Sequence, residues 1–105
     1  MTTLTPQNWH EFVTEPSAPA FVLFHSPYSA YSRRSLALLL ELEPQFPTVR
    51  FGSLDVDGHV DLARLHGIGS IPAFVIYRGG EKRAHFIGER REKRLVENIS
   101  KALAI

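Results

Sequence analysis

The segment from Ala20 to Pro44 constrains the fold more than any other part of this chain. It begins with Phe21-Val22-Leu23-Phe24, an uninterrupted apolar run that is typical of a central strand buried on both faces. Ser29 then supplies the hydroxyl that favours the N-cap of a helix. The helix expected after it has a wide apolar arc, formed by Leu36, Leu39, Leu40 and Leu42. A buried strand, a tight crossing and a well-packed helix therefore follow one another, and Pro44 ends the helix.

The segments on either side of this unit predict further strands and helices. Thr5-Pro6 indicates the start of a short helix, because a hydroxyl cap precedes a proline at the first helical position. The apolar face of that helix is formed by Trp9, Phe12 and Val13. Apolar runs bounded by turn residues predict strands over residues 49–56, 73–77 and 82–87. Helices are expected over residues 60–66 and 89–103, the last with Leu95, Val96, Ile99 and Leu103 on one stripe.

Together with one weak strand at the N-terminus, these elements give the order β-α-β-α-β-α-β-β-α. Strands separated by helices pair in parallel, whereas the Arg78-Gly79-Gly80-Glu81 turn joins the last two strands as an antiparallel hairpin. The compact arrangement is an α/β fold, a mixed sheet of about four or five strands with helices on both faces. Because there is no internal repeat or linker, we expect residues 1–105 to form a single domain.

Composition excludes several classes of function. The formal net charge is +1 and charged residues make up 22% of the chain, so no strong field for nucleic acid or an anionic membrane follows. No apolar run approaches the roughly 20 residues of a membrane span. The first residues lack the basic start and apolar core of a signal peptide, which favours a cytoplasmic protein. The absence of cysteine excludes disulfides, thiolate metal sites and thiol catalysis in this chain.

The crossing resembles the active-site motif of thioredoxin. Phe24 to Arg33 is similar to that family's strand end, aromatic residue, Cys-x-x-Cys and basic residue, without a gap. Tyr28 stands in the place of the family's tryptophan, and Ser29 and Ser32 stand in the places of its two cysteines. Ile71-Pro72 resembles the family's cis-proline pair, which faces the active site.

Further motifs extend the resemblance over nearly the whole chain. Leu54-Asp55-Val56-Asp57 resembles the family's strand that ends in an acidic turn. Gly80 and Gly88 match the hairpin glycine and the glycine before the final helix. Each motif is weak alone, but their order and near-family spacing imply the thioredoxin fold.

The departures from thioredoxin bear on activity. The family's buried aspartate below the site corresponds to Leu23, and its nearby lysine corresponds to Ser53. The family's helix-kinking proline corresponds to Ala37, so a straighter helix is expected here. The chain therefore lacks the sulfurs and the proton-handling side chains at the same time.

A second alignment places the motif one turn earlier. Ser26-Pro27-Tyr28-Ser29 resembles the Cys-Pro-Tyr-Cys of glutaredoxins. The thioredoxin alignment is preferred because its separation from Pro72 is closer to that family's, and because it puts Ser29 at the helix start. The spacing of Ser26, Ser29, Ser32 and Ser35 leaves a further interpretation, a metal or multi-thiol site whose cysteines were converted to serine.

Serine cannot replace cysteine in disulfide chemistry. Thiol–disulfide exchange requires a thiolate nucleophile and a sulfur leaving group. A helix N-terminus lowers the pKa of a cysteine, but it cannot form a serine alkoxide at neutral pH because an alcohol is far less acidic. We therefore expect no dithiol oxidoreductase activity from Ser29 and Ser32. A hydrolase using Ser29 would need an oriented base. The candidate base is His25, and no carboxylate is evidently placed to orient it.

The remaining polar candidates have simpler interpretations. His25 stands in the place of a family aromatic residue, so it is expected at the rim of the site. A metal role is not expected for it, because His59 and His66 lack a ligand spacing that would join it. Neither a metal nor a cofactor is predicted. Arg33 and Arg34 are expected on a solvated helix edge that an acidic partner can approach. The basic residues among positions 89–94 alternate with glutamates, which is typical of a solvated face rather than an RNA site.

Two functional interpretations remain. One is a redox-inactive domain that binds protein or extended peptide, as a chaperone, assembly factor or adaptor, since a peptide groove made of backbone does not need sulfur. The other is a thiol–disulfide oxidoreductase, natively a protein disulfide reductase, whose cysteines have been changed to serine. Leu23 and Ser53 favour the first, because a deliberate change would leave the proton-handling residues in place.

The expected binding surface gathers residues from three parts of the chain. Beside Ser29 and Ser32, it comprises Tyr28, Ala30, Tyr31, Ile71, Pro72 and Gly88. Since the pair Tyr28 and Tyr31 also permits self-association, a monomer or a weak homodimer is expected.

Overall fold

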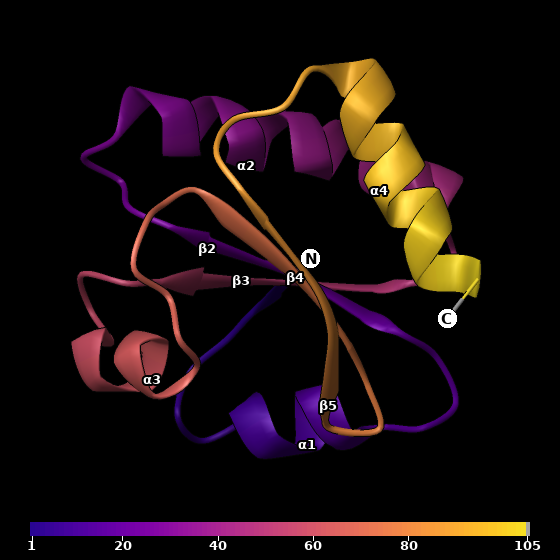
Figure 1. Cartoon of the computed structure of the whole chain (residues 1–105), viewed down its shortest axis with the longest axis horizontal. Coiled ribbons are helices and arrows are strands. Elements are labelled where there is room, and N and C mark those ends of the chain that lie inside the picture. Colours follow the sequence, from indigo (N-terminus) through magenta and orange to yellow (C-terminus); the bar gives the residue numbers. More distant parts are fainter. Residues whose placement is uncertain (105) are drawn as a thin grey trace.

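The computed structural model describes residues 1–104, which form one five-stranded sheet with helices on both faces (Figure 1). The strands are β1 (Thr2–Thr3), β2 (Ala20–His25), β3 (Arg50–Asp55), β4 (Ala73–Arg78) and β5 (Glu81–Ile87). The helices are α1 (Trp9–Thr14), α2 (Ala30–Leu42), α3 (Val60–Leu65) and α4 (Glu92–Ala104), and the 3-10 turn η1 (Glu43–Gln45) follows α2. The predicted order of elements is confirmed.

The central position in the sheet belongs to β2, as its apolar sequence predicts. The strand order is β1-β3-β2-β4-β5. β2 pairs in parallel with β3 and antiparallel with β4, so both of its edges are hydrogen-bonded. β4 and β5 form the predicted hairpin, and Gly79 and Gly80 at its turn have φ of 58° and 83°. Two consecutive positive φ values are what a type I′ hairpin turn needs, which explains the glycine pair.

Alternate residues of β2 supply the two halves of the core. Phe21 and Leu23 pack with buried residues of α2 and α4, whereas Val22 and Phe24 pack with Trp9 of α1. Figure 1 shows the corresponding layers, with α2 and α4 on one side of the sheet and α1 and α3 on the other. Because side chains alternate across a strand, an all-apolar strand is the sequence of a sheet that is covered on both faces.

Two predicted helix starts are wrong. α1 begins at Trp9 rather than at Thr5-Pro6, because the Thr5 carbonyl accepts the N–H groups of Asn8 and Trp9 in a turn that precedes the helix. α4 begins at Glu92 rather than at Glu89, because Glu89 is held against α2 by an ion pair with Arg34. The carbonyl of Arg91 then accepts the N–H of Leu95 in the first turn.

Two predicted core leucines lie at the surface instead. Leu40 of α2 is 50% exposed and Leu103 of α4 is 45% exposed. The buried stripes include small or polar residues in their place: Ser32 and Ser35 in α2, and Asn98 and Ala102 in α4. The spacing of the leucines therefore predicted a wider apolar face for each helix than the face that is buried.

Arg50, at the start of β3, fixes the end of α1. Its guanidinium donates to the carbonyls of Phe12, Glu15 and Ala18, the last at 2.9 Å from Nη2. These carbonyls lack helical partners, so a forked cation satisfies them and favours the negative end of the helix. None of the helices within residues 1–104 has the length and hydropathy to cross a membrane.

We predict that Arg50→Met lowers the free energy of unfolding by about 2 kcal/mol, because charge-assisted hydrogen bonds to carbonyls at and after the end of α1 are lost while the aliphatic stem is kept. Urea denaturation of the variant and the parent chain measures the difference. Arg50→Lys keeps the charge but not the planar fork, so it should recover less than half of the loss. A loss smaller than about 0.5 kcal/mol for Arg50→Met would show that this contact does not stabilise α1.

Candidate functional site

The crossing between β2 and α2 ends in the predicted N-cap. Ser29 has an extended backbone, and its Oγ accepts the N–H of Ser32 at 3.2 Å. Its own N–H donates to the carbonyl of Ser26 at 3.2 Å, which closes the turn before the helix. A hydroxyl cap of this kind stabilises a helix by roughly 1 kcal/mol. Ser29 is therefore already used as a structural residue.

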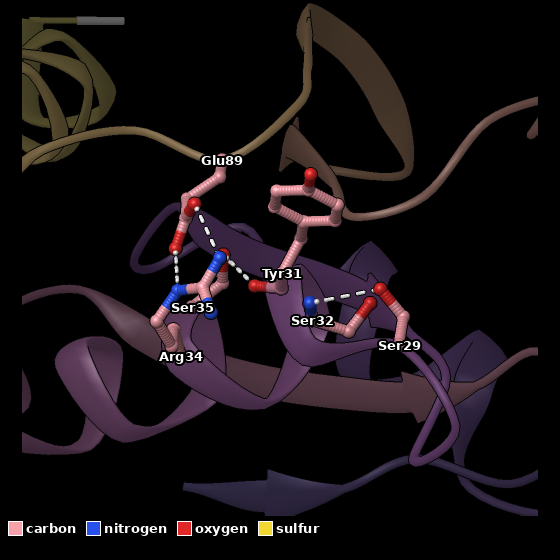
Figure 2. A network of polar contacts seen from close by, with 6 residues as sticks. All are labelled: Ser29, Tyr31, Ser32, Arg34, Ser35 and Glu89. Atoms are coloured by element: carbon pink, nitrogen blue, oxygen red, sulfur yellow. Dashed lines mark hydrogen bonds and ion pairs between the residues drawn. The ribbon is translucent and has the colours of Figure 1, made fainter.

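The three serines of the first turns of α2 have different surroundings (Figure 2). Ser29 is partly accessible, whereas Ser32 is fully buried. The Ser35 Oγ donates to the carbonyl of Tyr31 at 2.9 Å. The Ser32 Oγ has no hydrogen-bond partner within residues 1–104. The hydroxyl at the second motif position is therefore buried without a hydrogen-bond partner among the described residues.

We predict that Ser32→Ala raises the free energy of unfolding by about 1 kcal/mol, because a buried hydroxyl without a partner carries a desolvation cost that alanine does not have. Urea denaturation at neutral pH measures this change. Ser35→Ala is the matched control on the same helix, and it removes a satisfied hydroxyl. A lower stability for Ser32→Ala than for the parent chain would mean that the Ser32 hydroxyl is satisfied in solution.

Two tyrosines stand at the surface around this helix start. The side chain of Tyr28 is 86% exposed and that of Tyr31 is 61% exposed. The guanidinium carbon of Arg34 lies 5.1 Å from the centre of the Tyr31 ring, and Arg34 also pairs with Glu89 at 2.6 and 3.1 Å (Figure 2). This hydrogen-bonded pair holds the pKa of the Glu89 carboxyl below its usual value. Arg34 is exposed on the helix edge, as predicted, and its charge is matched by Glu89 within the chain.

The loop before β4 runs beside the crossing. Phe24 lies opposite Ala73 in the antiparallel register, so the next position brings Pro72 to the end of β2, next to His25. The Ile71–Pro72 bond is cis, and the Pro72 carbonyl accepts the N–H of Gly88 at 2.8 Å. Within residues 1–104 the backbone N–H and C=O of Ile71 have no hydrogen-bond partner. Pro72 and Gly88 are thus joined by a hydrogen bond, at the end of the sheet where the crossing with Tyr28–Ser32 leaves β2.

A partly buried contact between Ser26 and Asp57 was missed by sequence reasoning. The Ser26 Oγ donates to the Asp57 carboxylate and accepts the N–H of Tyr28 at 3.2 Å. The two residues are 31 positions apart, so no local periodicity connects them. A usable signal was the parallel pairing of β2 with β3, which places the residues after the two strands at the same edge of the sheet.

The geometry does not assemble a serine nucleophile with its base. The Ser29 Oγ accepts a backbone hydrogen bond, and no hydrogen bond joins it to His25 within residues 1–104. Burial lowers the pKa of His25, and the carboxylates of Asp55 and Asp57 oppose that effect. Asp57 binds Ser26, so it does not act as the orienting carboxylate of a triad. Residues 1–104 also hold no group of three or more His, Asp or Glu side chains gathered for a metal ion.

The two positions expected to handle protons hold neutral side chains that face each other in the sheet. Leu23 of β2 lies opposite Ser53 of β3. Leu23 is fully buried, and Ser53 is also buried. Within residues 1–104, these two positions therefore supply no carboxylate or ammonium that could exchange a proton with a group at Ser29 or Ser32.

A family model for thioredoxin matches residues 1–101. The chain belongs to the thioredoxin family. Among its relatives is the chloroplastic thioredoxin M4 of Arabidopsis thaliana, 28% identical over 101 residues, which are 95% of this chain and 52% of that protein. The H-type thioredoxin of Fagopyrum esculentum is 29% identical over 94 residues, covering 87% of this chain and 81% of that protein. The chain spans about half the length of the M-type curated relatives it matches.

Solved thioredoxin structures confirm the predicted fold. The thioredoxin of Fasciola hepatica superposes with a TM-score of 0.88 and 24% identity, over 97% of this chain and 99% of that one. Mitochondrial thioredoxin 3 of Saccharomyces cerevisiae, in its oxidised form, superposes with a TM-score of 0.85 and 22% identity, over 96% and 94% of the two chains. This thioredoxin-family domain therefore combines the fold of a redox protein with a sequence that contains no cysteine.

Proposed function

We propose that this thioredoxin-family domain binds proteins as extended peptides and carries out no disulfide chemistry. The binding site is the docking surface formed by Tyr28–Ser32, Ile71–Pro72 and Gly88. One observation carries the proposal: the crossing after β2 exposes two tyrosines, and at the same end of the sheet the segment before β4 has backbone hydrogen-bonding groups that are unused within residues 1–104. Such a surface offers what an extended peptide needs, without a reactive side chain.

The backbone at Ile71 supports recognition by strand addition. An extended peptide satisfies its own N–H and C=O groups by pairing with free backbone groups of this kind. Within residues 1–104 the N–H and C=O of Ile71 lack partners, and its side chain is partly buried against the core. The segment is therefore fixed in place while its backbone stays available.

The aromatic side chains support affinity. Tyrosine combines a large apolar surface with few rotatable bonds, and tyrosines are frequent among the residues that dominate binding energies. Tyr28 and Tyr31 lie on either side of the capped turn that begins α2. The same exposed pair allows weak self-association of the domain.

The proposal is tested with an unfolded polypeptide whose thiols have been blocked, such as carboxymethylated α-lactalbumin, in isothermal titration calorimetry. We expect saturable binding that Tyr28→Ala and Tyr31→Ala each weaken about ten-fold, as the loss of a central aromatic contact does. Leu40→Ala is the matched control, since Leu40 is an exposed apolar residue near the other end of α2. If the control weakens binding as much as the tyrosine variants, or if no binding occurs, the proposal fails.

The second candidate is a disulfide reductase whose two cysteines have been replaced. The unpartnered, fully buried hydroxyl of Ser32 favours it, because that position suits a thiol, which needs no strong hydrogen bond, better than it suits a hydroxyl. Leu23 and Ser53 oppose it, since the replaced residues would then include the ionisable pair beneath the site. The native coding sequence distinguishes the two candidates directly.

A further inference from the structure

We infer that the peptide bound at the docking surface carries an aspartate or glutamate whose carboxylate lies at the N-terminal turn of α2. This inference rests on the proposed function and names the chemical class of the partner. The inference is based on one part of that surface, where hydrogen-bond donors have no acceptor and a positive charge has no partner within residues 1–104.

The first turn of α2 has two unused backbone donors. The N–H of Ser29 binds Ser26 and the N–H of Ser32 binds the cap, but those of Ala30 and Tyr31 have no partner within residues 1–104. Both residues are exposed, and α2 is 13 residues long. Free N–H groups at the positive end of a helix favour an anion.

The hydroxyl of Ser32 adds a third unused donor in the same turn. It is fully buried and has no partner within residues 1–104. Figure 2 shows its oxygen turned toward Ser29, and therefore toward the helix start. An unsatisfied buried group costs free energy unless an incoming group compensates it. The helix start therefore has unpaired hydrogen-bond donors in a side chain as well as in the backbone.

Among the described residues 1–104, Arg33 is a cation at this turn that no carboxylate compensates. Arg33 donates from Nη1 to the carbonyl of Pro27 at 2.9 Å, which holds its guanidinium beside the turn, and no carboxylate within residues 1–104 pairs with it. Arg34 is matched by Glu89. The carboxylate of Asp57 is also close to the crossing, but it already accepts the hydroxyl of Ser26. A carboxylate between Tyr28 and Tyr31 would compensate Arg33 and the helix end together.

The test uses three short extended peptides that differ only at a central residue, which is glutamate, glutamine or lysine. Fluorescence polarisation with labelled peptides gives each dissociation constant. We expect the glutamate peptide to bind about five-fold more tightly than the glutamine peptide and the lysine peptide to bind most weakly. The preference for glutamate should shrink in about 1 M salt, where the screening length is about 3 Å.

Two variants locate the carboxylate. Ala30→Pro removes one free N–H without changing charge, and it suits the first helical position because Ser29 is already extended. Arg33→Gln removes the free cation. Each should reduce the glutamate preference about two-fold, whereas Lys101→Gln, an equal change of charge at the far end of α4, should leave it intact. Circular dichroism verifies that each variant is folded.

The outcomes separate this inference from the proposed function. If the glutamate and glutamine peptides bind equally, or if both variants keep the full preference for glutamate, the inference of an acidic peptide is wrong. The proposed peptide binding is not affected by either result. Tighter binding of the lysine peptide also overturns the inference of an acidic peptide. If none of the three peptides binds the parent chain, the acidic partner and the proposed function are both wrong.

Discussion

The double variant Ser29→Cys/Ser32→Cys is expected to reduce protein disulfides, whereas the parent chain is expected to show no such activity. Ser29 caps α2 and Ser32 lies in its first turn, so the new thiols stand three residues apart at the positive end of a helix. Residues at that spacing have their Cβ atoms about 5–6 Å apart, and the helix end lowers the pKa of the first thiol. Insulin reduction in the presence of dithiothreitol, followed by turbidity, measures the gain.

The matched control moves the cysteines by one turn. Ser26→Cys/Ser29→Cys reproduces the glutaredoxin-like alignment, but it breaks the hydrogen bonds of Ser26 to Asp57 and Tyr28. We expect less activity from this pair than from Ser29→Cys/Ser32→Cys. More activity from the control pair would contradict the alignment of Ser29 and Ser32 with the family's cysteines. An inactive, folded Ser29→Cys/Ser32→Cys variant would contradict it as well.

Leu23→Asp is expected to lower the free energy of unfolding by about 4 kcal/mol at neutral pH, because it puts an unpaired carboxylate into an apolar environment. Leu23 is fully buried, with Ser53 opposite it on β3 and Phe74 opposite it on β4. Neither neighbour carries a compensating charge. Urea denaturation measures the loss, and a large loss shows that the core beneath the helix start is packed around an apolar side chain.

The pH dependence of stability distinguishes the effect of the new charge in Leu23→Asp from the effect of its altered shape. Leu23→Asn has nearly the same shape as Leu23→Asp but cannot ionise. Burial raises the pKa of a carboxyl, so the folded aspartate variant binds a proton more readily than the unfolded one. Its deficit relative to Leu23→Asn should therefore be largest above the folded-state pKa and shrink as the pH falls through it. A deficit below about 1 kcal/mol at neutral pH, or one that does not change with pH, would contradict a dry site at Leu23.

The fold followed from short-range patterns in the sequence. The apolar run of β2, the glycine pair of the hairpin and the Ser29 cap each determine local structure, and the observed strands lie within a residue of the predicted ranges. Long-range contacts between polar side chains were not predicted. Arg34 and Glu89 are 55 residues apart, and their ion pair delays the start of α4, which no periodicity in residues 89–94 could show.

The positions of the candidate residues in the fold were predictable, but the hydrogen bonding of their side chains was not. The order of the motifs indicated that residues near 29, 72 and 88 would meet, and the pairing of β2 with β4 brings them together. Which hydroxyls are satisfied depends on packing. Ser29 and Ser32 look equivalent in sequence, yet one caps the helix and the other is buried without a partner.

Titration of the isotope-labelled chain with a thiol-blocked unfolded polypeptide, followed by backbone amide NMR, tests most directly whether a docking surface is retained without cysteine. Peptide docking predicts saturable shifts at Tyr28–Ser32, Ile71 and Gly88, and little change in the cavity that Phe12 and Arg50 line on the opposite face. Shifts confined to that cavity, or an unchanged spectrum at saturating polypeptide, would contradict it.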